Sequence, residues 1–132
     1  MKLLLDTHAV LWLLGDPGRI APEARRQIED LSNAVLISAV CAWEIATKHA
    51  IGKLPLPENP EALIERAIAE LRAVELSITA RHALHSASLP DHHRDPFDRL
   101  LVAQAMLEGA TLVTADHKLS LYGATLLRAD AR

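Results

Sequence analysis

Four acidic residues stand where one predicted element gives way to the next, or inside an apolar segment. Asp6 ends the apolar run at the start of the chain, and Asp116 follows a second apolar run. Glu44 interrupts an otherwise apolar helical turn, and Asp98 lies in the first turn of another predicted helix. Such carboxylates, gathered in one place, would repel one another and raise each other's pKa. The pattern predicts a site that a hard divalent cation neutralises.

The kind of cation follows from the donor atoms. Carboxylate oxygens suit Mg²⁺ or Mn²⁺, whereas Zn²⁺ favours nitrogen and sulfur ligands. Each acid also has a purely structural explanation. Asp6 and Asp116 could cap the helices that follow them, and Glu44 could pair with Lys48 four residues later. Asp98, in the sequence Asp95-Pro96-Phe97-Asp98, could simply interact favourably with the positive end of a helix dipole.

The charge balance limits the partners. Seventeen acids against fourteen bases give a net charge of −3, so bulk positive charge does not attract a polyanion to this chain. Setting the four candidate ligands aside leaves thirteen acids against fourteen bases. The metal-loaded protein is therefore predicted not to repel a nucleic acid.

Length and composition predict a single domain over residues 1–132. Half of the residues are hydrophobic and 23% are charged, which excludes a disordered chain. Aromatic residues make up only 3%, which favours helices over an all-β fold. The lone Cys41 cannot form an internal disulfide, and no signal peptide or membrane span is evident. We therefore expect a cytoplasmic protein that does not enter a membrane.

The elements that must position the four acids alternate along the chain. Strands are predicted at 2–6, 34–37, 74–78, 111–114 and 124–127, and helices at 9–14, 22–31, 39–51, 60–71, 80–87, 96–108 and 116–122. This alternation predicts an α/β fold, a three-layer α/β/α sandwich around a mostly parallel five-stranded sheet. Ligands of such folds bind outside the carboxyl ends of the strands, where Asp6 and Asp116 lie.

Four motifs in this order and spacing resemble a PIN domain over nearly the whole chain. They are the pair Asp6-Thr7, the helix 40–46, the run 94–105 and the segment 112–116. The Trp43-Glu44 helix, the segment 48–54 and the run 94–99 further resemble the toxin nucleases of VapBC-type toxin–antitoxin pairs. His8 departs from the commonest pattern, in which a small polar residue follows the Asp-Thr pair.

The resemblance implies a Mg²⁺- or Mn²⁺-dependent ribonuclease that a small VapB-type antitoxin inhibits. It implies Asp6 as the central metal ligand, Glu44 and Asp98 as further ligands of the catalytic ion, and Asp116 as a ligand that completes the site or holds a second ion. Thr7 and Thr114 would orient these ligands by hydrogen bonds. Toxins of this family are usually dimeric, which implies a homodimer.

The sequence provides weaker indications of the substrate and of the residues that would bind it. RNA as the substrate comes from the resemblance alone, and hydrolysis by a metal-bound water would leave a 5′-phosphate and a 3′-hydroxyl. Asp95 is predicted to cap its helix, with a role at the site as an alternative. Basic residues near the motifs could contact phosphates or be solvated surface charges: Lys48, Arg94, Arg99 and Lys118.

Other interpretations remain open. The same fold could be a binding module that holds metal or RNA without turnover. A phosphotransfer domain is disfavoured, because position 8 is His and the strand at 74–78 ends without a phosphoacceptor Asp. A zinc site is disfavoured too, because the seven histidines lack a standard ligand spacing and are expected at the surface. Trp12, Trp43 and the helix 63–71 belong either to the core or to a partner groove.

Overall fold

The computed structural model describes residues 1–131, and its centre is a parallel sheet with the strand order β3-β2-β1-β4-β5. In register, Leu4 lies opposite Leu36 on one side and Leu112 on the other. The strands span Lys2–Leu5 (β1), Ala34–Ser38 (β2), Val74–Leu76 (β3), Thr111–Thr114 (β4) and Leu126–Arg128 (β5). The predicted parallel sheet is therefore confirmed.

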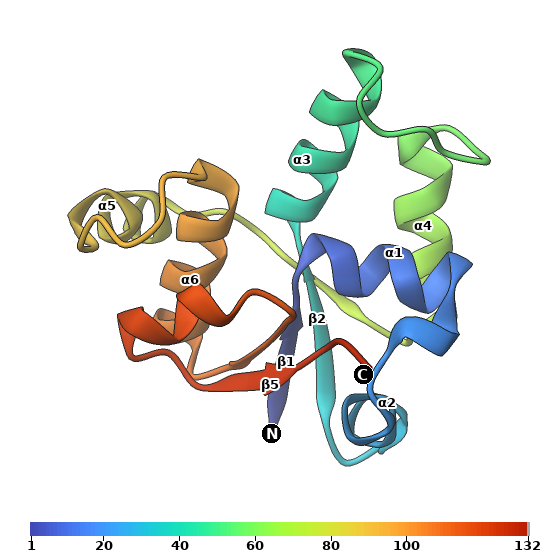
Figure 1. Cartoon of the computed structure of the whole chain (residues 1–132), viewed down its shortest axis with the longest axis horizontal. Helices are drawn as coiled ribbons and strands as arrows, with labels where there is room; N and C mark the ends of the chain where they lie inside the picture. The colour runs from blue at the N-terminus through green and yellow to red at the C-terminus, as the bar shows by residue number, and fades with distance from the viewer. Residues whose placement is uncertain (132) are drawn as a thin grey trace.

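Helices cover both faces of the sheet, which makes the predicted three-layer sandwich (Figure 1). The chain crosses from β1 through β2 to β3 on one face and returns to β4 and β5 on the other, as right-handed crossovers require. The first face carries α1 (Thr7–Gly15), α2 (Pro22–Glu29), α3 (Ala39–Ala50) and α4 (Pro60–Glu70). The second carries α5 (Ala80–Ser88), α6 (Pro96–Glu108) and the 3₁₀ helix η2 (His117–Tyr122).

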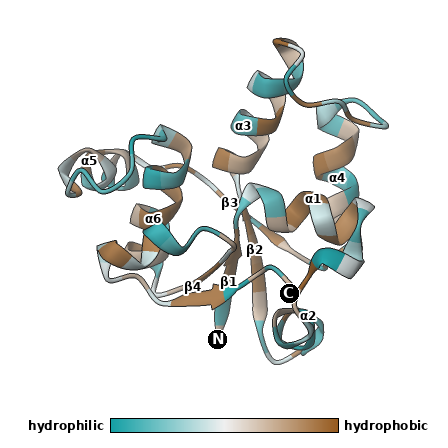
Figure 2. Cartoon of the chain, in the orientation of Figure 1, coloured by the Kyte–Doolittle hydropathy of each residue, from teal (hydrophilic) through white to brown (hydrophobic). Residues whose placement is uncertain are grey.

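The core lies along the inner strands. Leu3, Leu4 and Leu5 of β1 are all fully buried, because parallel strands that are covered on both faces have no solvent side. Figure 2 shows the strands mainly in the hydrophobic colour and the helices in both colours. Helix α6 is buried at every position from 100 to 105, since it packs against both the sheet and α5. This burial fixes the helix that carries Asp98.

The strand order decides where a ligand can bind. The direction of the crossovers reverses between β1 and β4, which are neighbours in the sheet. In parallel α/β sheets a crevice forms outside the carboxyl ends of the strands at this reversal point. Asp6 directly follows β1, and Asp116 follows β4 by two residues. The fold therefore brings these two acids to the two sides of one crevice.

Side-chain caps begin most of the helices near that crevice. The Asp6 carboxylate accepts a hydrogen bond from the Ala9 N–H, and Asp95 accepts bonds from the Phe97 and Asp98 N–H groups. Ser38 caps α3 by accepting a bond from the Val40 N–H. These caps satisfy N–H groups that a helix start leaves unpaired. They also fix the direction in which α1, α3 and α6 leave the sheet.

Several boundaries differ from the predicted ones. Helix α2 ends at Glu29 instead of residue 31, because the Asp30 carboxylate accepts hydrogen bonds from Ser32 and turns the chain. Strand β3 is shorter than predicted and lies at an edge of the sheet, where Val74 is 60% exposed. Instead of the helix predicted over 116–122, the chain forms the 3₁₀ helix His117–Tyr122, which Asp116 caps.

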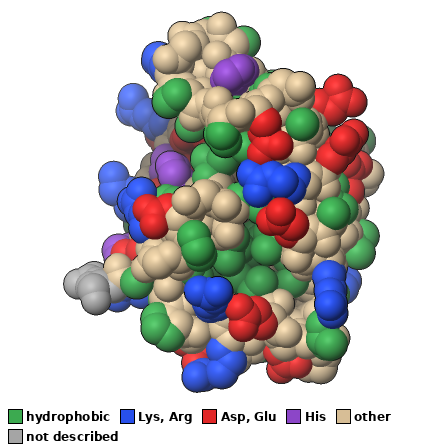
Figure 3. Space-filling model, turned by 90° about the vertical axis from the view of Figure 1, so that its right-hand side faces the viewer, with side chains coloured by type: hydrophobic (Ala, Val, Ile, Leu, Met, Phe, Trp, Pro, Cys, Tyr) green, Lys and Arg blue, Asp and Glu red, His purple; other side chains and the backbone are tan. Residues whose placement is uncertain are grey.

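The face formed by the right-hand side of Figure 1 has hydrophobic side chains gathered in a hollow, with charged side chains of both signs around them (Figure 3). Between α3 and α4 the structure contains a cavity of about 390 Å³, lined by Ala42, Ala46, Pro60, Glu61, Ile64, Glu65, Ile68 and Glu75. Within residues 1–131, no helix has both the length and the apolar character needed to cross a membrane.

Candidate functional site

Asp6 is held at the end of β1 by its backbone and its side chain. Its N–H donates to the Val113 carbonyl at 3.0 Å, and its Oδ1 accepts from the Ala9 N–H at 2.8 Å. The side chain is buried, and this burial raises the pKa of the Asp6 carboxyl above its usual value. Hydrogen bonds from the Thr114 hydroxyl and the Ala9 N–H lower it in part, while the charge of Glu44 raises it further. A buried carboxylate of this kind favours a cation beside it.

Glu44 lies in the second turn of α3 and is only 3% exposed. The Thr7 hydroxyl donates to its Oε1 at 2.5 Å, and the Lys48 ammonium pairs with its Oε2. The ion pair that the sequence offered as a structural explanation is therefore present. It does not take Glu44 away from the crevice, because Thr7 directly follows Asp6 and holds the other oxygen there.

Asp98 lies in the first turn of α6 and is brought near the other acids by the Asp95 cap. The pKa of the Asp98 carboxyl is raised to about 7, first by burial and then by the charges of Asp95, Glu44 and Asp6, while His93 opposes this shift. Repulsion from three carboxylates shows that Asp98 shares their surroundings. The Asp95 carboxylate is itself committed to the helix cap, as predicted.

Asp116 uses its two carboxylate oxygens for different partners. Oδ1 accepts from the Lys118 N–H at 3.0 Å, which caps η2, and Oδ2 lies 2.9 Å from Nε2 of His93. The Asp116 N–H donates to the Thr114 hydroxyl oxygen at 3.0 Å. Thr114 therefore contacts the backbone of Asp116 and lowers the pKa of the Asp6 carboxyl, and its role in orienting metal ligands stays a prediction.

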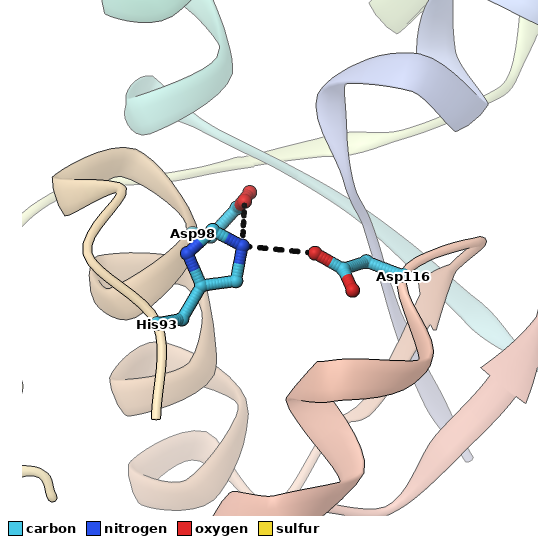
Figure 4. A group of neighbouring side chains, drawn as sticks. All are labelled: His93, Asp98 and Asp116. Carbon is cyan, nitrogen blue, oxygen red and sulfur yellow. Dashed lines mark hydrogen bonds and ion pairs between the residues drawn. The ribbon is translucent and has the colours of Figure 1, made fainter. Parts of the chain in front are cut away.

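His93 is a residue of this site that the sequence interpretation missed. It precedes α6, and its Nε2 lies 3.3 Å from Asp98 Oδ2 and 2.9 Å from Asp116 Oδ2, so its ring stands between the two carboxylates (Figure 4). The ligand atoms of these three residues lie within 4.8 Å of one another. The expectation of surface histidines is wrong for His93, and also for His82, which is 2% exposed. The signal in the sequence was the position of His93, two residues before the Asp95 cap.

The basic residues have different surroundings. Arg94 and Lys118 are exposed, and both line a cavity of about 350 Å³ beside Asp95 and His93. Lys48 is half-buried against Glu44. The guanidinium of Arg99 instead donates to carbonyls in the last turn of α5 and in the segment that follows it, at 2.9 Å for Ser86, Leu89 and Pro90 and 3.2 Å for His93. Arg99 therefore shapes the polypeptide around His93 and has few donors left for a phosphate.

The acids fit a hard divalent cation. Asp6 and Glu44 are buried carboxylates, and the pKa values of Asp6 and Asp98 are raised by burial and by neighbouring negative charge. Lys48 is paired with Glu44 and balances part of the negative charge of these acids with one ammonium group. A divalent cation would favour the ionised forms of these acids, and their donor atoms are the oxygens that Mg²⁺ and Mn²⁺ prefer.

Residues 3–124 match the family described as PIN domain. Two curated relatives come from Mycobacterium tuberculosis. One is named Ribonuclease VapC16, and it is 35% identical over 63 residues, which make up 48% of this chain and 45% of that protein. The chain therefore matches less than half of the length of that relative. The other is named Ribonuclease VapC22, and it is 29% identical over 118 residues, 89% of this chain and 88% of that protein.

The fold is also that of a solved structure, VapBC2 from Rickettsia felis bound to a DNA fragment from its promoter. The TM-score is 0.72 at 18% sequence identity, over 98% of this chain and 100% of that one. At this identity the likeness shows the fold. The family match covers most of β1, all of β4 and the four candidate acids Asp6, Glu44, Asp98 and Asp116. The chain belongs to the PIN domain family.

Proposed function

We propose that the protein is a Mg²⁺- or Mn²⁺-dependent endoribonuclease and the toxin of a VapBC-type toxin–antitoxin module. One observation supports the proposal: in a PIN domain, the charge of Glu44 raises the pKa of both Asp6 and Asp98, and His93 Nε2 lies between Asp98 and Asp116. The names of the two ribonuclease relatives support RNA as the substrate. A fold retained only for packing has no need to bury these mutually repelling charges.

In the proposed mechanism Asp6, Glu44 and Asp98 hold the catalytic ion, and Asp116 completes the site. The bound cation would lower the pKa of a water molecule and neutralise charge that develops on the phosphate. Thr7 fixes the rotamer of Glu44, and Thr114 links Asp6 to the backbone of Asp116. Hydrolysis by water at phosphorus breaks the P–O3′ bond and leaves a 5′-phosphate and a 3′-hydroxyl.

The proposed RNA path follows the basic side chains at the rim of the crevice. Arg94 and Lys118 are exposed beside the cavity next to Asp95, and both can reach phosphate oxygens of a bound strand. Lys48 lies on the α3 side, paired with Glu44. Arg99 contributes indirectly, because it orders the polypeptide that carries His93 and Arg94.

Cleavage of a mixed set of structured and single-stranded RNAs tests the activity, with Mg²⁺ or Mn²⁺ against EDTA. Loss of a ligand removes several kcal/mol of transition-state stabilisation, so Asp98→Asn should lower the rate by more than about 100-fold. Asp16→Asn is the matched control, because Asp16 is an exposed acid in a turn and is not among the residues proposed to bind metal or RNA. Equal cleavage by wild type and Asp98→Asn would show contamination, and metal binding without cleavage of any RNA would favour the silent binding module.

We also propose a VapB-type antitoxin as partner and a homodimer as the assembled state. The cavity between α3 and α4 has an apolar floor that includes Ile64 and Ile68, and its rim carries the acids Glu61, Glu65 and Glu75. Such a groove suits a segment with apolar and basic side chains. Co-purification with the product of an adjacent gene tests the partner, and light scattering after size exclusion tests the dimer. Absence of a complex with that product would overturn the antitoxin proposal.

A further inference from the structure

The ring of His93 poses a chemical question, because a histidine beside two carboxylates can either ligate a metal or donate a hydrogen bond. Its Nε2 lies between Asp98 Oδ2 and Asp116 Oδ2, as Figure 4 shows. Ligation needs a lone pair on Nε2, whereas donation needs a hydrogen there. The two roles therefore require opposite tautomers of the neutral ring.

The other ring nitrogen decides between them. The backbone N–H of Asp95 lies 3.0 Å from His93 Nδ1 and points at it. A backbone N–H can only donate, so Nδ1 must be the acceptor and must carry the lone pair. The hydrogen of the neutral imidazole is then on Nε2, which faces the two carboxylates. In this orientation no lone pair of His93 is available at the acidic site.

The orientation of the His93 ring is fixed by hydrogen bonds to the backbone carbonyl of His93 and to the ring itself. The carbonyl of His93 accepts hydrogen bonds from the Arg99 guanidinium at 3.2 Å and from the Tyr122 hydroxyl at 3.4 Å. The Asp95 N–H that contacts the ring belongs to the residue whose side chain caps α6. A 180° rotation of the ring about χ2 would place the Cδ2–H group against the Asp95 N–H and the Cε1–H group against the two carboxylates, so the hydrogen bonds on both sides of the ring would be lost. The Asp95 N–H at the start of α6 therefore determines the tautomer of His93.

We propose that His93 is a positioning residue that holds the Asp98 and Asp116 carboxylates with its Nε2–H and does not itself ligate the metal. One N–H shared between the two oxygens draws together acids that come from α6 and from the end of β4. This reduces their repulsion before a cation arrives and holds Asp98 Oδ2 and Asp116 Oδ2 on the same N–H group. The inference rests on the proposed function for the identity of the cation, but not for the tautomer.

The tautomer can be tested on the metal-free protein. Long-range ¹H–¹⁵N correlation spectra in mildly alkaline buffer distinguish a protonated from an unprotonated ring nitrogen, and His93 is assigned by its loss in His93→Gln. We expect Nε2–H and an unprotonated Nδ1. The opposite tautomer would overturn the proposal, whether or not the protein binds metal or cleaves RNA.

The role toward the metal is tested with Mn²⁺ on the full chain. Pulsed electron paramagnetic resonance detects a nitrogen bound directly to Mn²⁺, and we expect no such coupling from His93. Ligand-orienting hydrogen bonds are typically worth 10–100-fold in metal affinity. We therefore expect His93→Ala to weaken Mn²⁺ binding about tenfold or more in calorimetry. His93→Gln, whose amide N–H can replace Nε2–H, should remain within about threefold of wild type.

His92→Gln is the matched control, because the adjacent His92 ring packs edge-on against Tyr122, and among the described residues the ring has no hydrogen bond or ion pair to Asp98 or Asp116. A directly bound nitrogen that disappears in both His93 variants but persists in His92→Gln would overturn the proposal. So would equal Mn²⁺ affinity in His93→Ala and wild type. A protein that binds no Mn²⁺ at all would instead contradict the proposed function, and the spectra of the metal-free protein would still decide the tautomer.

Discussion

The Thr7 hydroxyl donates a 2.5 Å hydrogen bond to Glu44 Oε1, and both side chains are buried. The bond joins the start of α1 to the second turn of α3, across 37 positions of sequence. Because Lys48 occupies the other oxygen, Glu44 has a defined rotamer even without a cation. The site is therefore substantially organised before metal binds.

Thr7→Val removes this bond while keeping the shape of the side chain. With Oε1 unpaired, Glu44 can rotate, and we expect Mn²⁺ affinity to fall about 10-fold or more, as for other residues that orient metal ligands. Isothermal titration calorimetry measures the change. Thr7→Ser retains the hydroxyl and is expected to stay near wild type, so equal losses in both variants would contradict an orienting role for the hydroxyl.

The raised pKa of Asp98 predicts that the metal-free protein loses stability as pH rises. Between the usual aspartate pKa near 4 and the folded value of about 7, the folded state holds a proton that the unfolded state has lost. The free energy of unfolding therefore falls across this window and levels above it. At about 1.4 kcal/mol per pKa unit, the shift from near 4 to about 7 contributes about 4 kcal/mol.

Urea unfolding in EDTA across this pH range checks that prediction. Asp98→Asn cannot ionise, so its unfolding free energy should depend less on pH than that of wild type. Asp16→Asn, a change at an exposed acid in a turn, is the control and should keep the wild-type slope. Parallel curves for Asp98→Asn and wild type would mean that Asp98 titrates at its ordinary pKa.

Arg99→Lys tests the order that Arg99 imposes around His93. A lysine ammonium cannot satisfy the carbonyls of Ser86, Leu89, Pro90 and His93 together, as the guanidinium does. We expect faster amide hydrogen exchange over residues 89–95 and a loss of about 2 kcal/mol in unfolding free energy. Arg94→Lys, at an exposed position, should leave both unchanged. Unchanged exchange in Arg99→Lys would refute this role.

Gln104→Met tests a buried polar connection between the two helices that carry Glu44 and Asp98. The Ser38 hydroxyl, which caps α3, donates to Gln104 Oε1 at 2.5 Å, and Gln104 Nε2 donates to the Ser77 carbonyl at 3.2 Å. Methionine fills the space but leaves both partners unpaired, so unfolding free energy should fall by about 2–4 kcal/mol. Gln27→Met, at a half-exposed position of α2, should cost less than about 1 kcal/mol.

Much of the fold was predictable because its signals are local. The alternation of apolar strands with capped helices depends on residues a few positions apart, and it predicted the parallel α/β sandwich. The same locality explains why the structural roles offered for the acids are all present: Asp6 and Asp116 cap helices, and Glu44 pairs with Lys48. The cap on Asp6 uses Oδ1 alone, so a structural role for a carboxylate does not exclude a role at the site.

Tertiary structure determined which residues of the candidate site lie close to one another. The strand order places β1 beside β4, although more than a hundred residues separate Leu5 from Val113, and so brings Asp6 and Asp116 to one crevice. The position of His93 two residues before the Asp95 cap was the only local signal for it, because the roles of His93 and Arg99 depend on which carboxylates and carbonyls the packed chain places against them. The sequence determined which groups could bind a cation, and the packing of α3 and α6 around the sheet determined which ones meet.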